Sequence, residues 1–340
     1  MMIKRLGFFT RVLDDAAPAE RYRLATAQVV HAERCGFDSA WVAQHHFDGS
    51  EGGLPAPLVF LSHVAAQTSR IRLGTGIVTL PLENPVRVAE DASVLDLISG
   101  GRLEFGVGPG GTFTAFRAFD LDAADRGVLT ERNLAFLRDA WAGGPLPGGN
   151  RLYPTNVSLG ARIWQASFGV AGARRAGLAG DGLLLSRTQP RPDDAPGLSL
   201  DAIQEPMIDA YLAALPEGIE PRILASRTVF VADDEASARR LALGGLGRAR
   251  DRIIAMGRTP PAASAEAMIA AQDVHAGTPE AVIASLQADR TLSRATDLAV
   301  QVHSVDPPHD AILRSIELVA GVVAPALGWA AGPMEGRRAA

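Results

Sequence analysis

The stretch GTGIVTLPLENPVRVAEDASVLDLISGGRLEFGVGPGG, residues Gly74–Gly111, contains the repeating unit that decides the fold. An apolar run ends at Gly76, a helical pattern follows over Val86–Ile98, and a second apolar run covers Leu103–Val107. This order of strand, helix and strand is typical of a βα unit in a parallel sheet. Glycines follow both apolar runs, so the chain can turn tightly where each predicted strand ends.

The same alternation extends over most of the chain in both directions. Eight short apolar runs predict strands at Arg5–Thr10, Ser39–Ala43, Ile71–Gly76, Leu103–Val107, Arg162–Ala166, Gly182–Ser186, Arg227–Ala232 and Asp297–Val302. Apolar residues that return at three and four positions predict helices, among them Ala19–Arg34, Val86–Ile98, Arg126–Trp141 and His309–Val323. Eight units in succession favour an α/β fold closed into a (β/α)8 TIM barrel over an open sheet.

The 340 residues are compatible with one such domain over residues 1–330. Residues 331–340 carry no apolar pattern, and we expect them to be a disordered tail. Gly143–Leu159 is rich in glycine and proline, which predicts a loop, with a short hairpin as one possibility, outside the barrel. Arg187–Leu200 is polar, rich in proline and follows the sixth predicted strand, where we expect a mobile active-site lid.

Composition excludes several classes of function. Hydrophobic residues make up 47% of the chain and charged residues 21%, with a net charge of −5 and no basic stripe, so nucleic acid is not an expected partner. The single cysteine, Cys35, excludes an intramolecular disulfide. The first residues lack a signal-peptide pattern, and the most apolar segment, Leu318–Ala331, is too short to span a membrane. We expect a cytoplasmic protein with no membrane association.

The segment WVAQHHF, Trp41–Phe47, ends a predicted strand at two adjacent histidines. Adjacent side chains on an extended backbone point in opposite directions, so one of His45 and His46 can face the barrel mouth while the other packs in the wall. Imidazole exchanges its proton near neutral pH, which favours proton transfer or hydrogen bonding. Two histidines bonded to backbone carbonyls are the alternative, and no carboxylate at ligand spacing indicates a metal.

The segment GRLEFGVGPGG satisfies GxGxxG through Gly106, Gly108 and Gly111. We reject a dinucleotide-binding unit because no helix is expected directly after it, over Thr112–Gly127, and three βα units already precede it. A loop without side chains still lets a flat ring or a phosphate approach the backbone closely, which makes Gly108 a candidate cofactor contact.

The segment IWQASFGVAGARRAGLAGDG places a helix within a few residues of the fifth predicted strand. Ser167 resembles an N-cap, and Gly169–Ala171 would expose N–H groups at the positive end of that helix, a common site for anions. An ordinary capped helix remains the alternative. Arg126 is preferred over Arg174 as the charge partner of a bound phosphate, because Arg174 is expected one turn into the helix and facing away.

Together these segments resemble the bacterial-luciferase-like flavin-dependent monooxygenases and their deazaflavin-using relatives, from Lys4 to about Trp329. Gly74–Gly111 is the most specific stretch, because its strand, turn, PVRVAED helix, SGGRL connection and glycine loop follow the family's order without a gap. HHF upstream and AGDG downstream agree with it. The similarity lies with a branch expected to use FMN on a substrate that the sequence does not identify.

The resemblance implies the roles of specific residues. It implies reduced FMN, supplied by a separate reductase, that reacts with oxygen in a pocket that excludes water. His45 matches the family's catalytic histidine, an acid or base, and His46 is its neighbour in the wall. Residues matched to cofactor binding are Gly76 and Ile77 at an often cis peptide behind the ring, Ser167, Gly169 and Val170 at the phosphate, and Arg126.

Three departures from the family pattern argue against light emission. Gln44 replaces a glutamate before the histidine pair, Gly108 and Pro109 replace a cysteine and a phosphate-binding arginine, and Ala166 replaces an acidic residue. Oxygenation of another small organic substrate is the favoured function. A deazaflavin-dependent oxidoreductase and a non-catalytic flavin-binding protein are the alternatives. The resemblance also implies a homodimer through the helices after the second and third strands.

Overall fold

The strands of the chain close into a ring. The computed structural model describes residues 4–192, 194–255, 257 and 259–329. The ring consists of β1 (Arg5–Thr10), β2 (Ser39–Val42), β3 (Arg72–Thr75), β5 (Leu103–Gly108), β6 (Ile163–Ser167), β7 (Gly182–Leu185), β8 (Ile223–Val231) and β10 (Asp297–Gln301). All neighbours pair in parallel, and β10 pairs with both β1 and β8, which leaves the ring without a free edge. The predicted (β/α)8 barrel is confirmed, while the predicted tail at 331–340 lies outside the described residues.

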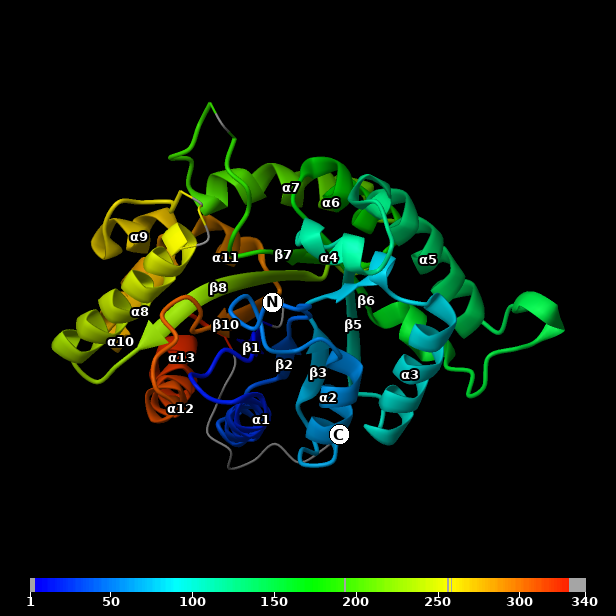
Figure 1. The fold of residues 1–340 in the computed structure, drawn as a ribbon, viewed down its shortest axis with the longest axis horizontal. Coiled ribbons are helices and arrows are strands. Elements are labelled where there is room, and N and C mark those ends of the chain that lie inside the picture. The colour runs from blue at the N-terminus through cyan, green and yellow to red at the C-terminus, as the bar shows by residue number, and fades with distance from the viewer. Residues whose placement is uncertain (1–3, 193, 256, 258, 330–340) are drawn as a thin grey trace.

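Helices surround the ring (Figure 1). They are α1 (Pro18–Arg34), α2 (Pro57–Ala65), α3 (Pro85–Ile98), α4 (Phe113–Ala118), α5 (Arg126–Trp141), α6 (Val170–Leu178), α7 (Leu200–Ala214), α8 (Glu235–Ala255), α9 (Ala265–Ala271), α10 (Pro279–Gln287), α11 (Arg290–Arg294), α12 (His309–Leu318) and α13 (Ala324–Ala326). α5 has its predicted bounds, and α1 and α3 begin one residue early at a proline, which suits a first helical position. Among the described residues, no helix is long and apolar enough to cross a membrane.

Two strands were not predicted. β4 (Val78–Thr79) pairs with the end of β5, and β9 (Val274–Gly277) pairs with the end of β8 outside the ring. Both are too short for a periodic signal. β8 also begins four residues before the predicted Arg227, because polar residues within this fully buried strand interrupt its apolar run.

The two predicted loops differ in how they attach to the barrel. In 143–159, Pro145 and Arg151 form an antiparallel bridge, and the segment projects to the right in Figure 1. The segment 187–199 contains no helix or strand among its described residues, but Arg187 and Gln189 are buried at its start. The proposed lid is therefore anchored at its first residues, and its mobility stays a prediction.

The inside of the barrel is filled by tryptophans that pack over glycines of the next strand. Trp41 on β2 pairs in register with Gly74 on β3, and Trp164 on β6 pairs with Gly182 on β7. A Cβ atom on Gly74 would lie 2.2 Å from the Trp41 ring, and one on Gly182 would lie 2.1 Å from the Trp164 ring. The two indoles meet edge to face at 5.6 Å, so the glycines make room for the central layer of the core.

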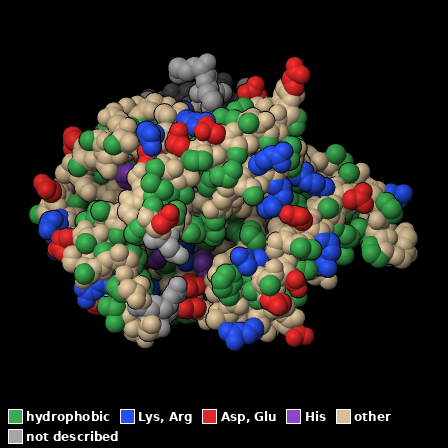
Figure 2. Space-filling view, turned by 90° about the horizontal axis from the view of Figure 1, so that it is seen from above, with side chains coloured by type: hydrophobic (Ala, Val, Ile, Leu, Met, Phe, Trp, Pro, Cys, Tyr) green, Lys and Arg blue, Asp and Glu red, His purple; other side chains and the backbone are tan. Residues whose placement is uncertain are grey.

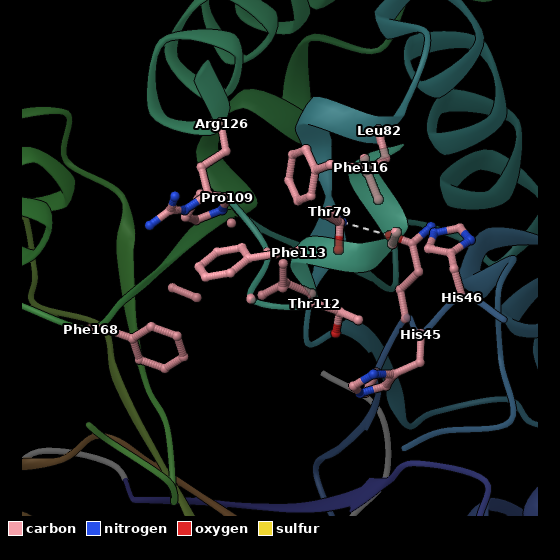
Figure 3. A pocket seen from close by; sticks show the side chains of 18 of the residues that line it. His45, His46, Thr79, Leu82, Pro109, Thr112, Phe113, Phe116, Arg126 and Phe168 are labelled. Carbon is pink, nitrogen blue, oxygen red and sulfur yellow. Dashed lines mark hydrogen bonds between the residues drawn. The ribbon is translucent and has the colours of Figure 1, made fainter. Parts of the chain in front are cut away.

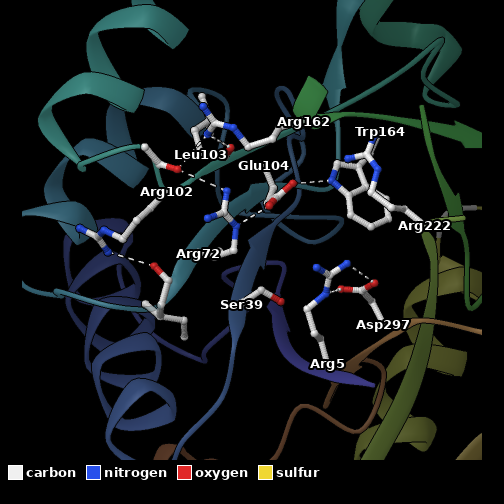
Figure 4. Close-up of polar contacts among 12 residues, drawn as sticks. Arg5, Ser39, Arg72, Arg102, Leu103, Glu104, Arg162, Trp164, Arg222 and Asp297 are labelled. Atoms are coloured by element: carbon white, nitrogen blue, oxygen red, sulfur yellow. Dashed lines mark hydrogen bonds and ion pairs between the residues drawn. The ribbon is translucent and has the colours of Figure 1, made fainter. Parts of the chain in front are cut away.

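Charged side chains close the amino-terminal end of the barrel (Figure 4). Glu104 pairs with Arg72 and accepts a hydrogen bond of 2.7 Å from the Trp164 indole. Arg5 pairs with Asp297 at 2.8 Å on the neighbouring strands β1 and β10. Because these charges are paired, this end of the barrel is a closed polar layer, and the opposite end is left for chemistry.

Candidate functional site

A cavity of about 630 Å³ opens at the carboxyl ends of β2 to β6 (Figure 3). This volume lies within the usual range for small-molecule sites. The cavity is lined by Ala43, Gln44, His45, His46, Gly76, Ile77, Thr79, Leu82, Gly108, Pro109, Gly110, Gly111, Thr112, Phe113, Ala115, Phe116, Arg126, Ala166, Ser167, Phe168, Arg175 and Pro190.

Most of the site residues expected from the sequence meet in this one cavity. Those that line it are His45, His46, Gly76, Ile77, Gly108, Arg126 and Ser167. Gly169 and Val170 are not among the lining residues and form the start of α6 beside it. Five strands separated by up to 130 residues of sequence thus contribute to one wall, although the roles of these residues remain proposals.

His45 is held as a neutral imidazole. Its Nε2 atom lies 3.1 Å from the Arg11 guanidinium, which can only donate, so Nε2 accepts and the proton belongs on Nδ1. The nearest carboxylate oxygen, on Glu51, lies 3.9 Å from Nδ1. Burial, aided by the positive charge of Arg11, lowers the pKa of His45 to about 3. The imidazole is therefore uncharged at neutral pH, and its expected role in proton transfer or hydrogen bonding stays a prediction.

His46 lies at the edge of the same cavity. Its ring meets Phe119 edge to face at 5.0 Å, and burial lowers its pKa. Its Nε2 atom is buried and has no hydrogen-bond partner in the described part of the chain. The two histidine side chains diverge in Figure 3, but the expectation that only one of them faces the cavity is wrong. β2 ends at Val42, so the alternation of an extended strand no longer applies at His45 and His46.

Gln44 ties the histidine segment to the next strand. Its amide nitrogen donates to the Pro55 carbonyl at 3.0 Å and to Glu83 at 2.6 Å, and its oxygen accepts from the Thr79 backbone at 2.6 Å. Both amide N–H groups and the amide oxygen of Gln44 are therefore bonded, and these contacts hold the start of the loop that carries His45 and His46. The position where the family pattern has a glutamate is therefore occupied by a positioning residue.

Glycines shape the wall opposite the histidines. A Cβ atom on Gly76 would lie 2.5 Å from the Phe9 ring, and one on Gly108 would lie 3.0 Å from Ile77 and 3.3 Å from Ala166. The Gly76–Ile77 peptide bond is cis, as the resemblance implied. Gly76 and Gly108 carry no side chain, so at these two positions a flat group can lie directly against the backbone.

One expectation about the glycine loop is wrong. The helix α4, Phe113–Ala118, starts two residues after Gly111, whereas no helix was expected there. Phe116 is buried among Leu82 and Ala115, and this small apolar cluster holds the single helical segment in place. Six residues are too few for a periodic signal, and tertiary packing supplies the stability that such a short helix lacks.

The opposite end of the cavity contains the open start of α6. The N-cap is Gly169 and not Ser167 as expected, because the helix starts at Val170. The Ser167 hydroxyl accepts from the Gly169 N–H at 3.1 Å and donates to its carbonyl at 2.7 Å. The first helical bond runs from Ala173 to Gly169, so the three preceding N–H groups have no acceptor in the helix.

Two arginines flank this helix start. Arg126 lines the cavity with its guanidinium 4.9 Å from the Phe113 ring centre, and it donates to the Ala123 carbonyl at 2.9 Å. Arg175 also lines the cavity and pairs with Glu131 at 2.9 Å. Sequence reasoning missed Arg175 and considered only its neighbour Arg174, which is absent from the lining. Its spacing could have identified it, because Arg175 lies three residues after Gly172 and residues three apart share one face of a helix.

Within the described ranges, no group of three or more histidine, cysteine or acidic side chains is arranged to hold a metal ion. The cavity itself offers a neutral imidazole, backbone amides and two guanidinium groups. Such a set can bind an anionic tail at one end and direct hydrogen bonds at the other.

Comparison with known proteins gives a family for the chain. A family model described as luciferase-like monooxygenase matches residues 5–296. The alkanal monooxygenase alpha chain of Photorhabdus laumondii is 34% identical over 159 residues, which cover 41% of this chain and 44% of that protein. The chain thus matches less than half the length of such curated relatives, in segments and not end to end.

Solved structures extend the likeness to the whole barrel. The FMN complex of the oxygenating constituent of 3,6-diketocamphane monooxygenase from Pseudomonas putida has a TM-score of 0.74 at 20% identity, covering 96% of this chain and 98% of that one. A coenzyme F420-dependent tetrahydromethanopterin reductase from Methanopyrus kandleri has a TM-score of 0.64 at 18% identity, covering 95% and 99%. At these identities the comparison shows a common fold.

Proposed function

The chain belongs to the luciferase-like monooxygenase family, and on that basis we propose that it binds reduced FMN and uses molecular oxygen to oxygenate a small organic substrate. One observation carries the proposal. A single cavity joins the open start of α6, which suits a phosphate, to a neutral histidine some 120 residues earlier in the chain.

At the phosphate end, the residues fit a dianionic group. The unbonded N–H groups at the start of α6 offer hydrogen-bond donors, and the helix dipole favours negative charge there. Arg126 and Arg175 supply two positive charges along the same wall. Gly169 and Val170 contribute through their backbone, which agrees with their position outside the side-chain lining.

At the ring end, the residues fit a flat aromatic system. Gly76 and Gly108 leave part of the wall without side chains, and Ile77, Phe113 and Phe116 add apolar surface to the cavity. When bound, reduced flavin supplies the electrons that activate oxygen. His45 then holds a proton on Nδ1 while Arg11 occupies Nε2, so it acts as an uncharged hydrogen-bond donor.

The proposal is tested by cofactor titration and oxygen uptake. We expect the purified protein to bind FMN in a saturable titration and to bind coenzyme F420 at least ten times more weakly. With a flavin reductase and NADH present, it should consume oxygen when a substrate is added. Preference for F420, with hydride transfer and no oxygen uptake, would instead support the deazaflavin-dependent alternative.

The non-catalytic alternative, a flavin-binding protein, has a separate outcome. It predicts tight FMN binding with no substrate-dependent oxygen uptake over a broad panel of substrates. The neutral imidazole and the apolar closure of the cavity favour catalysis, because a storage protein needs neither. A separate reductase, a homodimeric assembly and a cytoplasmic location complete the proposal and follow from the family resemblance.

A further inference from the structure

Two arginines, the buried Arg187 and the partly buried Arg11, lie at the barrel mouth without an acidic partner within 4.0 Å among the described residues. Arg11 follows β1 and Arg187 follows β7, and the strands β7, β8, β10 and β1 are consecutive in the ring. These four strands form the half of the barrel mouth that lies across from β2 to β6, where the cavity opens. Figure 2 shows histidine and basic side chains gathered at the floor of the hollow in this face.

The hydrogen bonds of both guanidinium groups are incomplete. Arg187 is 6% exposed, and within the described part of the chain its side chain makes one bond, to the Thr228 hydroxyl at 3.2 Å. Arg11 bonds His45 through Nη2, and its Nε atom is buried without a partner. Neither forms an ion pair within 4.0 Å with a carboxylate of the described residues. Unpaired buried charge is costly, so such an arrangement calls for a function.

Other arginines of low exposure have fuller sets of partners. Arg102 is 8% exposed and has no carboxylate within 4.0 Å among the described residues, but it donates to four backbone carbonyls and to the Thr68 hydroxyl. Arg227 is 0% exposed and pairs with Asp289 at 2.5 Å, and it also bonds Gln204. Arg162 pairs with the buried Asp96 at 2.6 Å. Incomplete hydrogen bonding, and not the lack of a carboxylate alone, therefore sets Arg11 and Arg187 apart from these arginines.

The carboxylates nearest the two arginines are already engaged. Asp306 accepts from His303 Nδ1 at 2.9 Å, and Glu51 accepts from the Thr112 hydroxyl at 3.1 Å. Burial and the charge of Arg11 lower the pKa of Arg187 to about 9, and burial also lowers that of Arg11. Both groups remain protonated at neutral pH, and Asp306 offsets part of their positive charge without forming an ion pair with either arginine within 4.0 Å.

The pair borders the proposed reaction site. Arg11 touches His45, which lines the cavity, and Pro190, three residues after Arg187, lines it as well. In Figure 3 the His45 ring faces the open space across from Phe168. Neither guanidinium is among the residues that line the cavity, so an oxyanion in that space would meet the pair at the border of the cavity, beside His45.

We propose that the substrate carries an oxyanion, a carboxylate or a sulfonate, that Arg11 and Arg187 bind beside His45, with an apolar body against Phe113 and Phe168. A planar guanidinium matches such groups with two parallel hydrogen bonds. This inference rests on the proposed function, because it places the substrate next to the flavin. The flavin phosphate is another possible source of the oxyanion, and the test separates the two.

The test compares benzoate and benzenesulfonate with the neutral benzamide, by calorimetric titration of the FMN-saturated protein and of the FMN-free protein. The wild type should bind at least one of the two anions about tenfold or more tightly than benzamide. Arg187→Gln and Arg11→Gln should each remove this preference and leave the affinity for FMN unchanged. Arg174→Gln, an exposed arginine outside the cavity, is the matched control and should change neither.

Three outcomes would contradict the inference. Equal affinity of the wild type for the anions and benzamide, or an unchanged preference in Arg187→Gln, would overturn it. Weaker FMN binding by Arg187→Gln would assign the pair to the cofactor phosphate. Arg187→Lys keeps the charge and should retain a reduced preference, which provides a second test if the glutamine variant does not fold. If the wild type did not bind FMN, the proposed function would be wrong. The inference about Arg11 and Arg187 would still be tested by the titration of the FMN-free protein.

Discussion

At the scale of single residues, adjacent arginines on α6 offer a sharp comparison. Arg175 lines the cavity beside Ser167, whereas Arg174 is exposed and outside it. We expect Arg175→Gln to weaken FMN binding by about tenfold, the usual effect of losing one charge-assisted contact. Arg174→Gln should bind FMN as the wild type does. Fluorescence titration of both variants checks this, and equal affinities would remove Arg175 from the phosphate site.

The neutral state of His45 leads to a second prediction at this scale. We expect His45→Gln to lower kcat by about 100-fold, in the range of a lost acid, base or oriented donor. Because the pKa of the imidazole is lowered to about 3, the wild-type kcat should show no inflection between pH 6 and 7 from this group. Steady-state oxygen uptake from pH 5.5 to 8.5 measures both. A wild-type inflection near pH 6.5 that disappears in His45→Gln would contradict the neutral assignment.

At the scale of an element, the two ends of β5 have different roles. Glu104, near its start, is paired inside the closed polar end, while Gly108, at its end, opens the cavity wall. We expect Glu104→Ala to lower the free energy of unfolding by about 3 kcal/mol, because it leaves Arg72 and the Trp164 indole without their partner. Glu104→Gln should cost about 1 kcal/mol, since its amide oxygen can still accept from Trp164.

Urea denaturation measures the stability of both Glu104 variants. The control is Glu90→Ala on α3, which breaks an exposed ion pair with Arg87 and should change the free energy by at most about 0.5 kcal/mol. If Glu104→Ala were no more destabilising than Glu90→Ala, the polar end of the barrel would not contribute to stability as described.

At the scale of the whole molecule, buried histidines make stability depend on pH. Burial lowers the pKa of His45 and His303 to about 3 and that of His275 to about 4. Between these values and the unfolded value near 6.5, the unfolded chain binds more protons, so the free energy of unfolding falls as pH falls. His275→Gln should reduce this slope by up to about 1.4 kcal/mol per pH unit between pH 6 and 4.5. Urea denaturation across that range checks the slope, and an unchanged slope would exclude a neutral His275.

The assembly of the molecule leads to the last prediction. Exposed apolar side chains gather on α2 and α3, the helices through which a homodimer is proposed: Val59, Val94, Leu97 and Ile98. We expect Leu97→Glu with Ile98→Glu to shift the mass from two chains to one in light scattering after gel filtration. Val128→Glu, on the equally exposed surface of α5, should leave the mass unchanged. A wild type that already elutes with the mass of one chain would refute the dimer.

Much of the barrel followed from local patterns in the chain. All eight strands of the ring were predicted, with most bounds within a residue or two, and α5 was predicted with its observed bounds. Local periodicity and proline or glycine at element ends depend on backbone geometry, which neighbours in sequence control. The position of His45, Gly108 and Ser167 at one rim follows from the barrel topology alone.

The charge state of the site was decided by residues far apart in the sequence. Burial and the charge of Arg11 keep His45 neutral, Arg175 enters the cavity through the orientation of α6, and Arg187 is buried beside Thr228 of β8. Burial and charge act through space, and no spacing along the chain encodes them. The sequence alone therefore determined which helices and strands form and in what order. The closed ring of strands determined which groups surround each side chain at the barrel mouth.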